Sequence, residues 1–191
     1  MFLFTSKRER NLWLWAFAVI IAIYSTLGLA GKLAANLRER NLLDSIYVFG
    51  FALAVIAIIG SGVKLRMGKY EIWVALGLVA VYGMVSVRFF LSPEERTHLF
   101  EYGIVATLIH QALLERKRNE GNVSVPALLA IIITALLGWL DEGIQALLPN
   151  RVYDISDVLF NALASFMAVI ASVILSAARK KMTKKGDVST N

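Results

Sequence analysis

The sequence predicts an all-α polytopic membrane protein, a bundle of six transmembrane helices with both termini in the cytoplasm. The first observation is composition: 58% of the 191 residues are hydrophobic and only 18% are charged, and the mean hydropathy is +0.64. A soluble domain of this size cannot hide so much apolar surface in one core. The second observation is that the apolar residues form long segments separated by short, charged connections.

Six apolar segments are each long enough to cross about 30 Å of hydrocarbon. Lipid offers the backbone no hydrogen-bond partner, and no segment shows the alternation of barrel strands, so each is predicted to be a helix. In chain order, we place the six spans at residues 12–30, 45–63, 72–91, 98–114, 126–148 and 158–178. Together they form a single membrane domain over residues 1–191.

The first span follows three basic residues, Lys7, Arg8 and Arg10, as the apolar core of a signal peptide does. Its apolar run is too long for such a core, and no Ala-x-Ala cleavage site follows it. We therefore expect this span to be retained.

Lys and Arg residues alternate in number from one connection to the next. Fourteen lie before the first span and in residues 64–71, 115–125 and 179–191. Five lie in residues 31–44, 92–97 and 149–157. Because basic residues favour the cytoplasmic side, both termini are predicted to be inside.

Two of these connections carry further expectations. Residues 31–44 fit either an exposed connection or a short helix lying on the outer surface, with Leu33 and Leu37 on its apolar side. The basic tail at 179–191 fits attraction to anionic lipid of the inner leaflet. Because the basic residues stand in short runs between apolar segments, we expect the lipid bilayer as a partner and no nucleic acid.

The predicted topology brings the start of the fourth span, the end of the fifth and the start of the sixth to the outer side. Polar residues are concentrated in these three places: His98, Glu101, Asp141, Glu142, Gln145, Arg151, Asp154, Asp157 and Asn161. Within each segment most of them stand three or four residues from another, as Asp141 and Glu142 do from Gln145, so they share one helix face. Ionisable groups cost about 2.5–3.5 kcal/mol each at the centre of a span and usually mark function.

Three interpretations of this polar group are open. The residues can hold helices together, although such contacts contribute only about 0.6 kcal/mol each. They can bind a divalent cation such as Zn²⁺ or Mn²⁺, with ligands from His98, Glu101, Asp141 or Glu142, and Asp157. They can also perform acid–base catalysis, for which the candidates are His98, Glu101, Asp141, Glu142 and Asp157.

Binding of a phosphate or carboxylate group is expected from arginines near the same side of the membrane. The predicted substrate-binding residues are Arg88, Arg96, Gln145, Arg151, Asp154 and Asn161. Ser156 is expected to cap the sixth span. The chain has no cysteine, which excludes disulfides and thiolate ligands.

The run Asp141-Glu142-Gly143-Ile144-Gln145 is followed by Arg151, Asp154, Asp157 and Asn161, and is preceded by Glu95-Arg96-Thr97-His98. This order resembles the VanZ-like family of bacterial membrane proteins over residues 85–175. The first two or three spans carry no motif of that family. The chain also departs from the family at Ala164-Ser165, where a glycine often follows the Asn position.

The resemblance implies a protein that recognises or modifies an envelope lipid or cell-wall precursor, with a link to teicoplanin-type glycopeptide resistance. Both pure binding and catalysis fit the residues. Two other classes stay open: a small transporter or proton-coupled carrier, and a non-catalytic partner in a membrane complex. Between the outer polar group and His110 the spans are almost wholly apolar, which disfavours transport.

Overall fold

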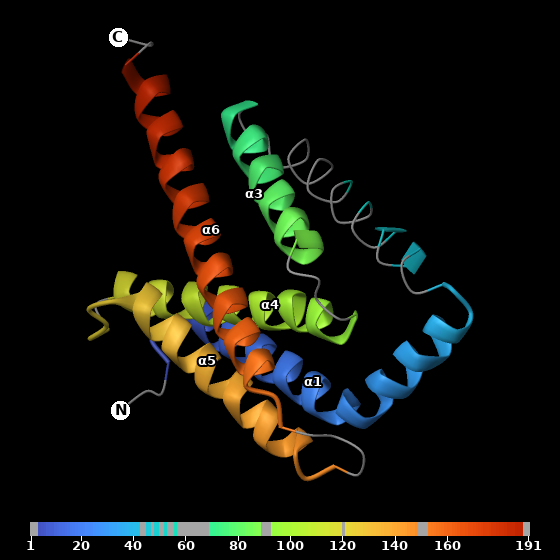
Figure 1. Cartoon of the computed structure of the whole chain (residues 1–191). Coiled ribbons are helices and arrows are strands. Elements are labelled where there is room, and N and C mark those ends of the chain that lie inside the picture. The colour runs from blue at the N-terminus through green and yellow to red at the C-terminus, as the bar shows by residue number, and fades with distance from the viewer. Residues whose placement is uncertain are drawn as a thin grey trace. The chain divides into compact units, whose positions relative to one another are not determined.

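The computed structural model describes residues 4–42, 45, 46, 48, 49, 52, 56, 69–88, 93–119, 121–148 and 153–188. These residues form helices and turns with no strand, as the composition predicted. The helices are labelled in Figure 1: α1 (Lys7–Glu39), α3 (Lys69–Arg88), α4 (Pro93–Arg118), α5 (Pro126–Gln145) and α6 (Ile155–Val188).

These helices contain most or all of five of the six predicted spans, and the span at 45–63 lies almost wholly outside the described residues. Among the described residues, two helices are long and apolar enough to cross a membrane, Pro126–Gln145 and Ile155–Ala177. The fifth span was predicted to run to Leu148, but α5 ends at Gln145. The N–H groups of Leu147 and Leu148 bond three residues back, in a tighter turn, because Pro149 disfavours helix in the residue before it.

Residues 31–39 are helical and continue α1, so the interpretation as a simple exposed connection was wrong for them. The interpretation as a helix on the outer surface stays a prediction. α1 ends at Glu39, and two residues later Asn41 has a left-handed φ of 55°. The N–H of Leu42 then donates to the carbonyl of Leu37 at 3.0 Å, a bond that closes helix ends of this kind. At the other terminus, α6 extends to Val188, so most of the predicted basic tail is helical.

The chain divides into two compact units, one formed by residues 1–33 and 92–170, the other by residues 34–91 and 171–191. The first unit holds the beginning of α1, all of α4 and α5, and the first half of α6. Asp141, Glu142 and Gln145 all belong to this first unit.

In the first unit, α4 and α5 pack along each other and are joined by a short loop (Figure 1). The apolar core is made of small and branched side chains from four helices: Ala16, Ile23, Val105, Ala106, Ile109, Leu113, Ala130, Ala168 and Val169. Small residues let helix backbones approach closely, which fits the alanines that recur every four residues along α6.

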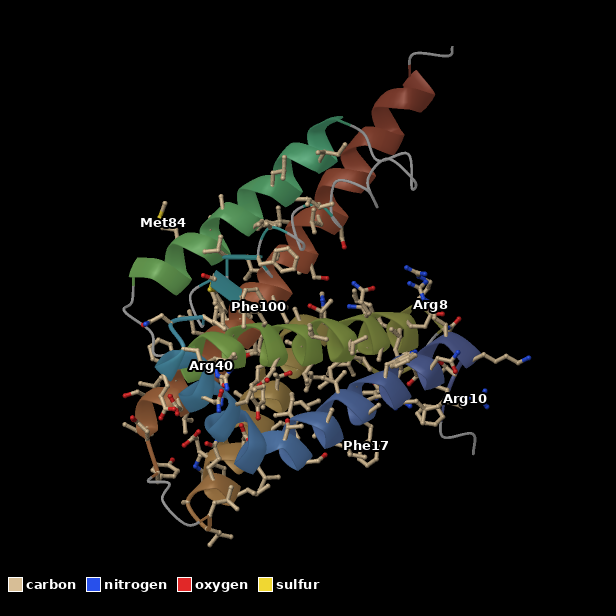
Figure 2. All side chains as sticks on the ribbon, turned by 90° about the vertical axis from the view of Figure 1, so that its right-hand side faces the viewer. Arg8, Arg10, Phe17, Arg40, Met84 and Phe100 are labelled. Atoms are coloured by element: carbon tan, nitrogen blue, oxygen red, sulfur yellow. The ribbon has the colours of Figure 1, made fainter. Side chains whose placement is uncertain are left out.

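Large apolar side chains project outward from the first unit. Phe17, labelled in Figure 2, is 62% exposed on α1, and Leu136 is 57% exposed on α5. Others on the same helices and on α6 are also exposed: Leu14, Trp15, Ile21, Leu128, Ile132, Leu140, Leu159 and Phe166. This outer surface matches the apolar solvent expected for these helices.

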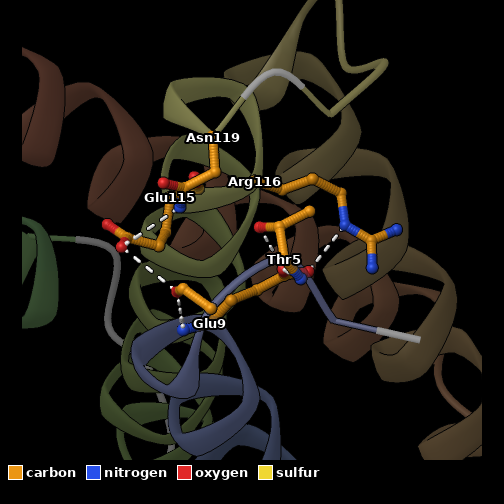
Figure 3. A network of polar contacts seen from close by, with 6 residues as sticks. Thr5, Glu9, Glu115, Arg116 and Asn119 are labelled. Atoms are coloured by element: carbon orange, nitrogen blue, oxygen red, sulfur yellow. Dashed lines mark hydrogen bonds and ion pairs between the residues drawn. The ribbon is translucent and has the colours of Figure 1, made fainter. Parts of the chain in front are cut away.

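A polar network ties the start of α1 to the end of α4 (Figure 3). The carboxylate of Glu9 is fully buried and accepts from the backbone N–H and hydroxyl of Thr5 at 2.6 and 2.7 Å. It also accepts from Nε of Arg116 at 2.6 Å. Ser6 caps α1 by accepting from the N–H of Glu9 at 3.0 Å, and its hydroxyl donates to Glu115 at 3.2 Å.

Glu9 is charged at neutral pH. Burial acts to raise the pKa of its carboxyl, but the hydrogen bonds from Thr5 and the ion pair with Arg116 outweigh it and lower the pKa below 4.5. A carboxylate with a lowered pKa in the folded state stabilises that state above its unfolded pKa. The stabilisation is lost as the pH falls through the folded pKa.

We predict that Glu9→Gln lowers the free energy of unfolding by about 1–3 kcal/mol, because the amide has one acceptor oxygen in place of two and no charge to pair with Arg116. Thermal unfolding of purified protein in detergent measures the loss. Glu39→Gln, the same change at an exposed acid, should have almost no effect. The difference in the free energy of unfolding between wild type and Glu9→Gln should be largest at pH 7 and should shrink below pH 4.5. Equal unfolding temperatures of Glu9→Gln and Glu39→Gln at pH 7 would contradict the stabilising role of Glu9.

Candidate functional site

The buried face of α5 is small and polar. It consists of Ala130, Thr134, Gly138, Asp141 and Gln145, spaced four, four, three and four residues apart, with Glu142 beside Asp141. The opposite face is apolar and exposed, for example at Leu136 and Trp139. This is the reverse of the pattern in a helix of a soluble protein, where the polar face meets water.

α6 crosses α5 at a close contact between Asn161 and Gly138. The amide of Asn161 donates to the Gly138 carbonyl at 3.4 Å. A Cβ atom placed on Gly138 would lie only 2.5 Å from Cβ of Asn161. Thr134 lies one turn before Gly138 on α5, and Ser165 lies one turn after Asn161 on α6. Both side chains are fully buried.

Asp141, Glu142 and Gln145 form what we call the α5 polar cluster. Nε2 of Gln145 donates to Glu142 at 3.0 Å and to Asp141 at 3.4 Å. All three side chains are at most 1% exposed. A neutral amide that bridges two carboxylates holds both in fixed positions.

The loop before α6 is tied to this cluster. The backbone N–H of Asp154 donates to Glu142 at 3.4 Å. The side chain of Asp154 accepts from the N–H of Ser156 at 2.8 Å, so Asp154 caps α6. The prediction that Ser156 is the cap was wrong because α6 begins at Ile155, too early for Ser156 to precede it.

α1 and α4 close the site from the other side. Glu101 and Tyr102 on α4 and Tyr24 on α1 all interact electrostatically with Asp141. The Tyr24 hydroxyl donates to the carbonyl of Leu137 at 2.8 Å, which ties α1 to α5. Sequence analysis missed Tyr24, although it is the one tyrosine of the first span, which was the available signal.

The structure brings four of the predicted residues together: Glu101, Asp141, Glu142 and Gln145. Asn161 contacts Gly138, three residues before Asp141 on α5. Asp157 is partly buried in the first turn of α6, whereas Asp154 is exposed and its side chain caps the helix. The side chains of His98, Arg88 and Arg96, and the whole of Arg151, lie outside the described residues. Their functional roles stay predictions.

Among the described side chains, no group of three His, Asp or Glu residues is arranged to hold a metal ion. The predicted ligand set included His98, whose side chain is not described, together with Glu101, Glu142 and Asp157. The described part of that set therefore gives the divalent cation no support, and the cation stays a prediction.

No family model, curated protein or solved structure matches this chain. The resemblance to the VanZ-like family therefore rests on the spacing of the residues quoted above.

We predict that Gly138→Ala destabilises the folded chain by about 1–3 kcal/mol, because the new methyl group overlaps Asn161. Gly143→Ala is the matched control on the same helix, where an added Cβ has nothing within 4 Å. That control should be neutral or stabilising by up to about 1 kcal/mol. Thermal unfolding in detergent compares the stability of the two variants. If Gly143→Ala loses as much stability as Gly138→Ala, the close crossing of α5 and α6 at Gly138 is disproved.

Proposed function

We propose that this chain is a VanZ-like multi-pass protein of the bacterial plasma membrane, with six spans and both termini in the cytoplasm. The observation that carries the proposal is the burial of two carboxylates, Asp141 and Glu142, in a helix whose outer face is apolar. In membrane proteins, ionisable residues within spans face the interior of the bundle and mark function, while apolar side chains face lipid.

The N-terminal network supports the orientation. Glu9 and Arg116 form an ion pair, so the start of α1 and the end of α4 lie on the same side of the first unit. Both segments are rich in Lys and Arg, which favours the cytoplasmic side. The α5 polar cluster lies near Tyr24 in the middle of α1 and Glu101 in the first half of α4, away from this network, and would then face the outer leaflet.

At that side, the proposed ligand is an envelope lipid or a lipid-linked cell-wall precursor. Arg151 and Arg96 are the proposed contacts for its phosphate or carboxylate groups. The α5 polar cluster would orient the ligand or move protons, since its carboxylates are held in place by Gln145. By the family resemblance, the biological outcome would be altered sensitivity to a teicoplanin-type glycopeptide.

A carrier function is less well supported. Along both α1 and α4, apolar core residues separate the N-terminal network from the α5 polar cluster, among them Ala16 and Ile23 on α1 and Val105 and Ile109 on α4. A proton or ion relay needs polar groups that continue across the membrane. A purely structural role of the α5 polar cluster is distinguished from a functional one by the Glu142→Gln variant.

The orientation is testable because the chain has no cysteine of its own. We predict that Leu147→Cys, at a side chain 85% exposed after α5, reacts with a membrane-impermeant maleimide on intact cells. Asn122→Cys, in the exposed loop before α5, should react only after the membrane is permeabilised. The reverse labelling pattern would overturn the topology and the outer-leaflet site with it.

We further predict that Glu142→Gln removes function without unfolding the protein. In a teicoplanin-sensitive bacterium, the wild type should change the inhibitory teicoplanin concentration, and Glu142→Gln and Asp157→Asn should not. Loss of a buried charged contact weakens binding at least about tenfold, so mass spectrometry should also find less envelope lipid copurified with Glu142→Gln. Glu39→Gln is the exposed control and should behave as wild type. If the Glu142→Gln protein is inserted, folded and fully active, the proposed site is wrong.

A further inference from the structure

Basic side chains gather where the start of α1 meets the end of α4. Residues 5–10 and 115–119 contain six lysines and arginines and two glutamates, so together they carry a net charge of +4. The exposed basic residues, which we call the α1–α4 basic cluster, are Lys7, Arg8, Arg10, Lys117 and Arg118. A concentration of exposed positive charge attracts anions, including the phosphate groups of lipids.

Two arginines of this cluster meet at one carboxylate, that of Glu115, which is labelled in Figure 3. Nη1 of Arg8 lies 3.6 Å from Oε2 of Glu115, and Nη1 of Arg118 lies 3.5 Å from the same oxygen. The other oxygen of Glu115 accepts from the hydroxyl of Ser6 at 3.2 Å. Because both arginines contact one oxygen, their guanidinium groups are no farther apart than these two contacts together.

The two arginines can bind a further anion while they contact Glu115. Each contact uses a single nitrogen, whereas a guanidinium group carries five N–H donors. The side chains of Arg8 and Arg118 are 60% and 69% exposed, so a ligand can reach both. A phosphate accepts at about 2.8 Å through several oxygens, which makes it large enough to bridge the two groups. Two positive charges against one carboxylate leave an excess of positive charge for it.

Farther along α1, the exposed side chains are apolar. Leu14, Trp15 and Phe17 are all more than half exposed, and Figure 2 shows Phe17 well along the helix from Arg8. Trp15 comes seven residues after Arg8, so the two share one face of α1, about 10 Å apart along its axis. Tryptophan is typical of the membrane interface. A phosphate site followed by an apolar face fits a phospholipid, whereas a free phosphate or a nucleic acid has no acyl chain to cover that face.

We propose that Arg8 and Arg118 bind the phosphate of an anionic phospholipid whose acyl chains lie against Trp15. The positive charge of the cluster favours a headgroup such as phosphatidylglycerol, which has no cation of its own, over phosphatidylcholine. The bound lipid fastens α1 to α4 at the level of the Glu9–Arg116 ion pair. This inference goes beyond the proposed function, since it requires the chain to lie in a membrane but does not depend on the ligand of the α5 polar cluster.

The test is the thermal unfolding of the full chain, purified in a neutral detergent, as dioleoyl phosphatidylglycerol is added to the micelles. A ligand that binds only the folded state stabilises it in a saturable manner. Phosphatidylglycerol should therefore raise the Tm of the wild type to a plateau, and dioleoyl phosphatidylcholine should not. Combining Arg8→Gln with Arg118→Gln should raise the half-saturating concentration of phosphatidylglycerol at least about tenfold.

Arg10→Gln is the matched control. It removes the same charge from an exposed side chain of the same helix turn, two residues from Arg8 and therefore on a different side of α1. Its half-saturating concentration should stay close to that of the wild type. Exposed ion pairs contribute little to stability, so the double variant should fold. Arg118→Gln alone should show part of the loss and keeps the test informative if the double variant does not fold.

Four results would overturn the site. They are a wild-type Tm that phosphatidylglycerol does not raise, an equal rise with phosphatidylcholine, an unchanged response in the double variant, and a loss in Arg10→Gln as large as in the double variant. Stabilisation by inorganic phosphate at the concentrations that suffice for the lipid would overturn the lipid as the ligand. Glu142→Gln should keep the full response to phosphatidylglycerol, so failure of this site is distinguishable from failure of the proposed function.

Discussion

The close approach of α5 and α6 at Gly138 is the constraint on which the interior of the first unit depends. With no side chain at this position, Asn161 lies directly on the α5 backbone and donates to its carbonyl. The contact buries Thr134 on one side of the crossing, and Asp141 and Glu142 on the other. A larger residue at Gly138 would separate the helices and expose the polar face of α5 to a solvent that cannot hydrate it.

The first unit has a polar interior and an apolar exterior. Burying carboxylates is costly unless other groups bond to them. Gln145 and the backbone of Asp154 supply such bonds to Glu142, and Gln145 also reaches Asp141, so the cluster is held from α5 itself and from the loop that follows it. Groups held in this way are preorganised, which suits either ligand recognition or proton transfer.

Two sets of polar contacts in the first unit join α1 to different helices. At one end, Glu9 and Arg116 fasten the first turn of α1 to the last turns of α4. At the other end, Tyr24 fastens α1 to the backbone of α5 and lies near Asp141. The apolar core between the ends carries the packing, so each polar group can be changed with the helix arrangement otherwise preserved.

The sequence by itself determined the helical class and the shared face of Asp141, Glu142 and Gln145, because both follow from periodicity within one segment. The cap at the start of α1 is also encoded locally, in the spacing of Ser6 and Glu9. Only the tertiary structure decided that Tyr24 reaches Asp141, that Asn161 meets Gly138 and that Glu9 pairs with Arg116. The physical reason is that periodicity identifies the buried face of a helix, whereas the residues that meet it are chosen by packing between segments far apart in the chain.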